Sequence, residues 1–141
     1  MTNEQLINLL QQDLANERKH MMFYLQAGVM VKGLHREELS ELFLKEAQDE
    51  HKHVVEFSRL IVQLGGVPET KVNSCPLNLS DPNALLGYAV CMEQEVADIY
   101  ATRLDTIQGS TGIPKYVSLF YEDQLQDSQS TALELSLYLK S

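Results

Sequence analysis

The chain has 141 residues, 44% of them hydrophobic, which is enough to bury one core, so we expect a single domain over residues 1–141. Its 20 acidic and 11 basic residues give a net charge of −9, which favours cations as partners and disfavours nucleic acid. The first residues show no basic region followed by an apolar stretch, and the chain has no apolar run of about eighteen residues. We therefore expect a cytoplasmic protein that has no membrane partner.

Apolar residues recur at helical spacing in four tracts, which are separated by segments rich in glycine and proline. The first helix is predicted over residues 3–31 and the second over residues 36–64, where Gly65-Gly66 stops it. Ser80-Asp81-Pro82 predicts the start of a third helix that runs to about Gln108. Pro114 opens the fourth, whose inward face is expected to extend to Tyr138.

The connections between these tracts predict the architecture. The turns near Gly33 and over residues 108–112 are short, so each half of the chain should be an antiparallel helical hairpin. The connection over residues 65–80 is long enough to cross over. We therefore predict an all-α fold, an antiparallel four-helix bundle with a long crossover between the second and third helices.

Polar residues interrupt the apolar face of every predicted helix. In the first two helices the interrupting residues are Glu17, Glu46, Glu50 and His53. The third helix has Glu93 on its inward face and Glu95 about half a turn away, and the fourth has Gln124 and Asp127 between Tyr121 and Thr131. All four helices thus place polar side chains in the predicted core.

The depth of these residues follows from the hairpin geometry, because two residues lie level when their mean number falls at the turn. Glu17 and Glu50 have a mean of 33.5, and Glu93 has a mean of 108.5 with Gln124 and of 110 with Asp127. Buried carboxylates that face each other cost several kcal/mol each unless a cation neutralises them. The level positions therefore favour a metal site near mid-length, although for any single residue a buried ion pair is an equally good interpretation.

The donor types indicate which metal would bind. Glu50 and His53 project from one face at a spacing of three residues, and a Glu from each of two other helices completes most of a di-iron carboxylate pattern. Oxygen-rich surroundings with one imidazole favour iron or manganese over a structural zinc. Cys75 and Cys91 lack metal-binding spacing, and we interpret them as reduced thiols.

At these residues the chain resembles the ferritin-like superfamily, with bacterioferritins and ferritins nearest in layout. The resemblance covers residues 3–138 and rests on an ordered set: Glu17 with Tyr24 seven residues later, Glu50-His-Lys-His53 before Gly65-Gly66, Met92-Glu93, and Glu122-Asp-Gln124. It implies a di-iron centre in which Glu17 and His53 hold one iron, Glu93 and the side of Gln124 and Asp127 hold the other, and Glu50 bridges them.

The fourth helix departs from the family pattern. Bacterioferritins usually repeat Glu-x-x-His there, whereas this chain has Gln124-Leu-Gln-Asp127. The expected pair is therefore asymmetric, with one tight and one labile metal site. His20 is a candidate assistant to the site, although a satisfied core or surface histidine is the commoner case.

Two further residues have roles only through the resemblance. His51 occupies the place of a haem-binding methionine in bacterioferritins, so haem is a candidate cofactor, but a solvent-facing histidine is the preferred interpretation. Tyr24 is a candidate electron donor or hydrogen-bond partner of a ligand carboxylate, or it only packs in the core.

The resemblance implies a homo-oligomeric ferroxidase that oxidises Fe(II) to Fe(III) with dioxygen or peroxide, for iron storage or detoxification. One alternative is a rubrerythrin-like peroxide-reducing protein, against which stand the lack of a Cys-rich segment and Val96 where a further inward Glu is needed. The other alternative is a non-catalytic helical interaction module whose inward charges have no function.

Overall fold

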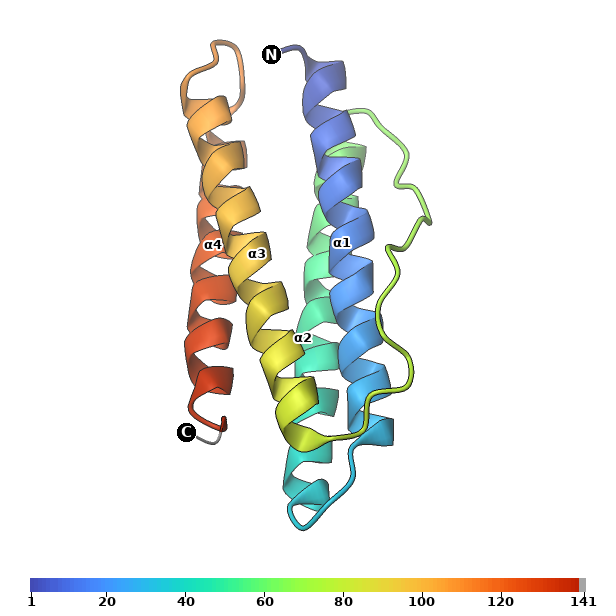
Figure 1. Ribbon diagram of the computed structural model, residues 1–141. Coiled ribbons are helices and arrows are strands. Elements are labelled where there is room, and N and C mark those ends of the chain that lie inside the picture. Colours follow the sequence, from blue (N-terminus) through green and yellow to red (C-terminus); the bar gives the residue numbers. More distant parts are fainter. Residues whose placement is uncertain (140–141) are drawn as a thin grey trace. The chain divides into compact units, whose positions relative to one another are not determined.

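The computed structural model describes residues 1–139, and in this range it contains four helices and no strand (Figure 1). The helices are α1 (Asn3–Met30), α2 (Arg36–Gln63), α3 (Pro82–Gln108) and α4 (Lys115–Ser136). The four helices predicted from the sequence are therefore all present, and their ends differ from the prediction by at most two residues. The chain divides into two compact units, residues 2–85 and the residues from Leu86 onward.

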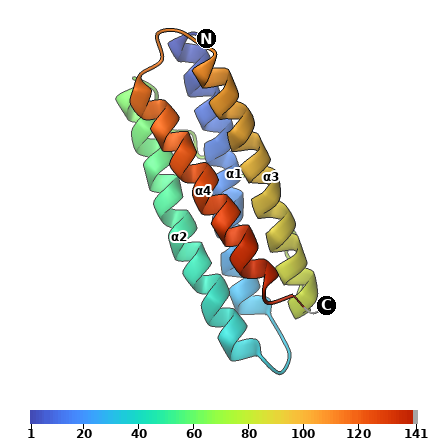
Figure 2. The ribbon, with the colours of Figure 1, turned by 90° about the vertical axis from the view of Figure 1, so that its left-hand side faces the viewer.

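Local sequence sets the ends of α1. Thr2 caps its first turn by a reciprocal capping box, in which the Thr2 hydroxyl accepts from the Gln5 amide and the Gln5 side chain accepts from the Thr2 amide. The helix ends at Met30, and Gly33 then adopts a φ of 112°, which side-chain-bearing residues rarely adopt. The chain reverses there, so α1 and α2 form an antiparallel hairpin (Figures 1 and 2).

The α1–α2 hairpin is held by aliphatic and aromatic side chains from both helices. The Tyr24 ring on α1 stacks on the Phe43 ring on α2 with centroids 6.4 Å apart. Near the turn the absence of a side chain at Gly28 lets the helices approach closely, since a Cβ there would lie only 2.7 Å from the side chain of Leu44. Ser40 donates a hydrogen bond of 2.6 Å to the Gly28 carbonyl at the same place. The following side chains of the hairpin are fully or almost fully buried: Leu6, Leu10, Leu14, Phe23, Tyr24, Phe43, Phe57 and Ile61.

The long connection after α2 follows α1 along its length. Gln11 donates to the Val67 carbonyl and accepts from the Glu69 amide, the Asn73 amide donates to Ala15, and the Lys32 amide donates to Ser80. The connection has no helix of its own, and it reaches α3 near the end of α1 (Figure 1). These hydrogen bonds satisfy backbone and amide groups that would otherwise need water.

The second unit is built on the α3–α4 hairpin. Asp81 accepts from the Ala84 amide and Pro82 is the first residue of α3, as the sequence predicts. Within the hairpin Tyr100 on α3 packs edge-on against Tyr121 on α4, with centroids 5.6 Å apart. The prediction for Tyr138 is wrong, because α4 ends at Ser136 and the Tyr138 side chain is 48% exposed.

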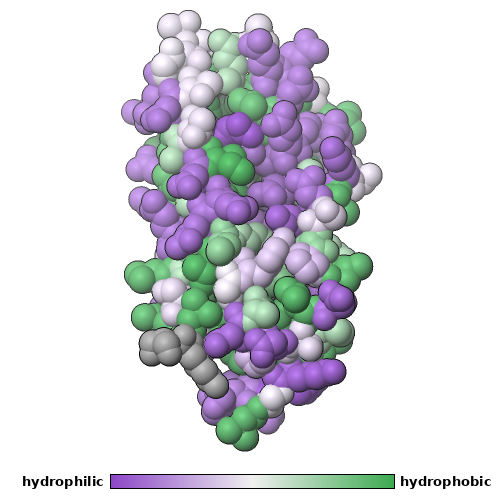
Figure 3. All heavy atoms as spheres, in the orientation of Figure 1, coloured by the Kyte–Doolittle hydropathy of each residue, from purple (hydrophilic) through white to green (hydrophobic). Residues whose placement is uncertain are grey.

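Polar and apolar side chains are mixed over the face shown in Figure 3. Within the described part of the chain, none of the helices combines the length and the apolar character that crossing a membrane requires.

Candidate metal centre

Three donor side chains meet inside the α1–α2 hairpin, namely Glu17 from α1 and Glu50 and His53 from α2. One possible ligand atom from each lies within 4.8 Å of the others. His53 Nδ1 is 3.2 Å from Glu50 Oε2 and 3.5 Å from Glu17 Oε2. The level placement of Glu17 and Glu50 that the sequence predicts is therefore confirmed.

The helix geometry explains why these residues converge. A spacing of three residues on α2 puts Glu50 and His53 on one face, and the antiparallel partner brings Glu17 to the same depth. Both glutamates are buried, with 1% exposure for Glu17 and 3% for Glu50, whereas the His53 side chain keeps 14% of its surface exposed. The cluster thus has one side close to solvent, at His53.

Burial and mutual repulsion change how these groups titrate. Burial, followed by the charge of Glu50 and a hydrogen bond with it, raises the pKa of Glu17 from 4.5 to about 7. Burial alone would lower the pKa of His53, but the hydrogen bonds and charges of the two glutamates outweigh it and raise this pKa from 6.5 to about 12. Without a metal, Glu17 and His53 therefore hold their protons more tightly than usual, and a bound cation would replace these protons.

A second histidine lies beside the same cluster. His20, on α1, is 1% exposed, and its Nδ1 is 3.9 Å from Glu50 Oε1. The sequence interpretation treated His20 as a residue of secondary interest, because one histidine on a helix face is usually structural. The signal that identifies it is the spacing of three residues from Glu17, which repeats the spacing of Glu50 and His53.

The second unit carries the other predicted donors. Glu93 on α3 is 1% exposed while Glu95 is exposed, so the choice between these two acids is confirmed. Gln124 on α4 is 2% exposed, and its Oε1 has no hydrogen-bond partner in the described part of the chain. Asp127 is exposed, so its predicted position on the inward face is wrong; Ser128 is buried there instead.

Of the two remaining candidates, one is exposed and the other is buried. His51 is exposed on α2, in agreement with the solvent-facing interpretation. Tyr24 is fully buried between the rings of Phe23 and Phe43. Sequence reasoning missed Asp13, which is 3% exposed one turn before Glu17 and could have been found from that spacing.

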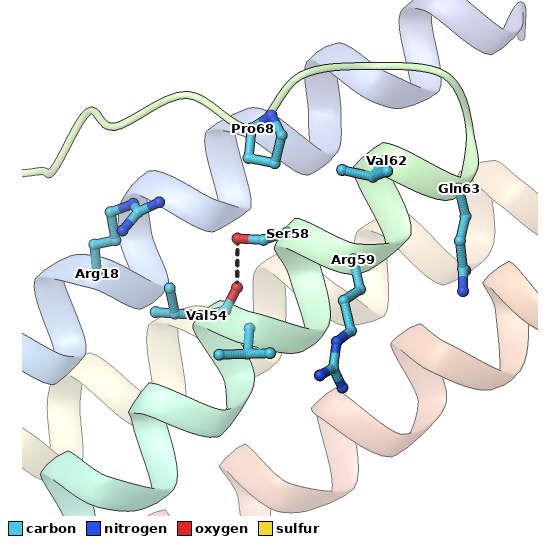
Figure 4. A pocket seen from close by; sticks show the side chains of 8 residues that line it. Arg18, Val54, Ser58, Arg59, Val62, Gln63 and Pro68 are labelled. Atoms are coloured by element: carbon cyan, nitrogen blue, oxygen red, sulfur yellow. Dashed lines mark hydrogen bonds between the residues drawn. The ribbon is translucent and has the colours of Figure 1, made fainter.

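A separate groove of about 540 Å³ lies over α1, α2 and the start of the long connection (Figure 4). Three valines and Pro68 form half of its lining residues, and the side chains of Arg18 and Arg59 extend in different directions. Ser58 is occupied by a hydrogen bond of 2.7 Å to the Val54 carbonyl. None of the described residues that line the groove carries a carboxylate or an imidazole, so it does not extend the candidate metal centre.

Comparison with known proteins agrees with a ferritin-like fold. The profile of the ferritin family, described as a ferritin-like domain, matches residues 7–141. No curated protein sequence matches the chain. A solved structure titled as ferritin-like, diiron-carboxylate proteins from Bacillus anthracis is 27% identical with a TM-score of 0.89, over 99% of this chain and 100% of that chain.

Two more distant structures are similar to this chain in fold. A dodecameric thioferritin of Bacteroides fragilis is 20% identical with a TM-score of 0.84, over 98% of this chain and 86% of that chain. The Desulfovibrio desulfuricans bacterioferritin, whose title names a diiron site, is 19% identical with a TM-score of 0.83, over 95% of this chain and 77% of that chain. The fold class expected from the sequence, all-α and ferritin-like, is confirmed.

Proposed function

This chain belongs to the ferritin family, and from that premise we propose that it is a ferroxidase, which binds Fe(II) at the Glu17, Glu50 and His53 cluster and oxidises it to Fe(III). The observation that carries the proposal is the convergence of two buried carboxylates and one imidazole within 4.8 Å. Facing carboxylates repel each other and lose hydration, and the raised pKa of Glu17 indicates that the neighbouring His53 does not fully offset this cost.

The donor set fits iron. Carboxylate oxygens and an imidazole are hard to borderline ligands that suit Fe(II) and Mn(II). Burial and the neighbouring Glu50 carboxylate raise the pKa of Glu17 to about 7, so a bound cation would reduce the cost of its charged form. Iron, when bound, supplies the electrons that reduce dioxygen or peroxide.

The chain's own residues hold and position the metal. Glu17 and His53 would bind one iron, and Glu50 would bridge to a second. By the family pattern Glu93 and Gln124 would be ligands of the second iron. The Oε1 of Gln124 is buried and has no hydrogen-bond partner among the described residues, which supports a ligand role for this amide. Asp127, which is exposed, is the weaker candidate of the two α4 residues. Tyr24, two helical turns after Glu17, would hydrogen-bond to a ligand carboxylate or donate an electron.

We propose further that the active form is a homo-oligomer and that the oxidised iron is stored or detoxified. The dodecameric assembly named for the Bacteroides fragilis relative supports the oligomer.

Fe(II) loading tests the proposal. The full chain is loaded with Fe(II) without oxygen, then exposed to dioxygen or peroxide, while ferric absorbance and the iron kept in soluble protein are recorded. Protein-dependent oxidation should be lost in Glu50→Gln and kept in the control Glu56→Gln, which changes an exposed glutamate on the same helix. Absence of both iron binding and protein-dependent oxidation in the unmodified chain would refute the ferroxidase and leave the helical interaction module.

A further inference from the structure

The proposed function uses one histidine, yet two of the four histidines lie in the cluster. His35 and His51 are exposed, whereas His20 and His53 face Glu50. The sequence contains no histidine after His53. Helix α4 therefore cannot supply the second imidazole that a Glu-x-x-His motif there would provide.

The same motif occurs instead on both helices of the first hairpin. Glu17-Arg-Lys-His20 on α1 has the spacing of Glu50-His-Lys-His53 on α2. The helices are antiparallel, and each cross-helix pair, Glu17 with His53 and His20 with Glu50, has a mean residue number of 35, at the turn. The two motifs therefore lie within about one helical turn of the same depth and face each other across the hairpin.

Distances agree with this pairing. His53 Nδ1 lies 3.5 Å from Glu17, and His20 Nδ1 lies 3.9 Å from Glu50. Glu50 presents Oε2 to His53 and Oε1 to His20, which is the arrangement of a carboxylate that bridges two positions. Two ligand atoms about 2.1 Å from one ion lie roughly 3.0–4.2 Å apart, depending on the angle, and the measured distances fall in that range.

We propose that His20 is a metal ligand, so that the α1–α2 hairpin supplies both imidazoles of the centre and α4 supplies none. This inference rests on the proposed function. His53, Glu17 and Glu50 Oε2 define one metal position, and His20 with Glu50 Oε1 defines the other. A buried imidazole at the second position shifts its preference toward Co(II), Zn(II) and Fe(II) and away from Mn(II) and Mg(II).

The competing role is that His20 only positions Glu50. A positioning histidine and a ligand histidine both affect activity, so a loss of oxidation in a variant does not separate them. The number of imidazoles bound to the metal does, because only a ligand contributes to it.

The test is X-ray absorption spectroscopy of the unmodified full chain loaded with Co(II), which counts imidazoles from their scattering. Two imidazoles for each pair of cobalt ions are expected. One imidazole for each pair overturns the ligand role of His20 and leaves the proposed function standing. Failure of the chain to bind either Co(II) or Fe(II) overturns both.

Matched variants add an affinity measurement. His20→Gln keeps a polar side chain but removes the imidazole, and it should halve the imidazole count and weaken binding of the second Co(II) by about tenfold or more. Binding of Mn(II) should change less. His35→Gln, a change in the exposed turn, should leave both values unaltered. An unchanged imidazole count in His20→Gln overturns the proposal, and the measurement on the unmodified chain decides it even where the variant fails to fold.

Discussion

Glu17 carries much of the electrostatic cost of the metal-free centre. Its pKa is raised from 4.5 to about 7 and that of His53 from 6.5 to about 12, so the folded chain holds both protons more tightly than the unfolded chain. A group of this kind stabilises the fold fully below its unfolded pKa, and the contribution is lost as the pH rises through the folded value. For Glu17 that window is pH 4.5 to about 7.

This titration predicts how metal binding depends on pH. Because a bound cation displaces these protons, the increase in melting temperature caused by Mn(II) or Co(II) should be larger at about pH 8 than at about pH 5.5. Thermal melts with and without metal at the two pH values measure it. In Glu17→Gln, which has no carboxyl proton to lose, both the metal-induced increase and its pH dependence should shrink. An equal increase at both pH values in the unmodified chain would contradict the prediction.

Tyr24 gives a second prediction for a single residue. Tyr24→Phe keeps the stacked ring against Phe43 and removes only the hydroxyl, so Co(II) affinity should stay within about threefold and the free energy of unfolding should fall by about 1 kcal/mol. We expect slower iron oxidation, measured by stopped-flow absorbance. Oxidation at the original rate would show that Tyr24 only packs in the core.

Single residues show how far sequence reasoning reaches. The choice of Glu93 over Glu95 is correct because apolar neighbours on α3 define one face clearly. Asp127 is misplaced because α4 is rich in polar residues and its inward face follows Gln124 and Ser128, four residues apart. The burial of His20 beside Glu50 could not be predicted from α1 alone, because the matching motif lies thirty-three residues away on α2.

At the level of elements, Gly65 terminates α2. It follows the last turn with a φ of 96°, and a Cβ there would meet no atom within 4 Å. Gly65→Ala should therefore lower the free energy of unfolding by about 1 kcal/mol through backbone strain alone.

Gly87 is the matched control for that substitution. It lies within α3 and its Cβ position is also open, so Gly87→Ala should raise the free energy of unfolding by up to about 1 kcal/mol through helix propensity. Urea denaturation of the two variants measures both effects. If both variants changed the free energy of unfolding equally and in the same direction, backbone strain at Gly65 would not be the cause of the change.

Element ends were predictable where the sequence carries a local signal, such as Asp81-Pro82 or Gly65-Gly66. The end of α4 was not, because no glycine or proline follows Ser136 and helical spacing continues to Tyr138. The path of the long connection was also beyond prediction, since it depends on side-chain hydrogen bonds from Gln11 and its neighbours to a segment more than fifty residues away.

For the whole molecule, the testable property is assembly. We expect size-exclusion chromatography with light scattering to give a mass several times the 16.0 kDa of one chain. Apolar side chains on the outside of α1, including Met22, Leu25 and Val29, are between 44% and 63% exposed and are suited to burial between copies. A monomer at micromolar concentration would contradict the homo-oligomer.

The arrangement of the donors along the chain has a consequence for synthesis. Both Glu-x-x-His motifs are complete at His53, and α3 does not begin until Pro82. A ribosome therefore makes two glutamates and two imidazoles of the proposed centre before it makes any residue of the second hairpin. The first hairpin is local in sequence and closes through a short turn, a topology that forms quickly. The order of translation therefore completes this part of the proposed donor set before the second hairpin exists.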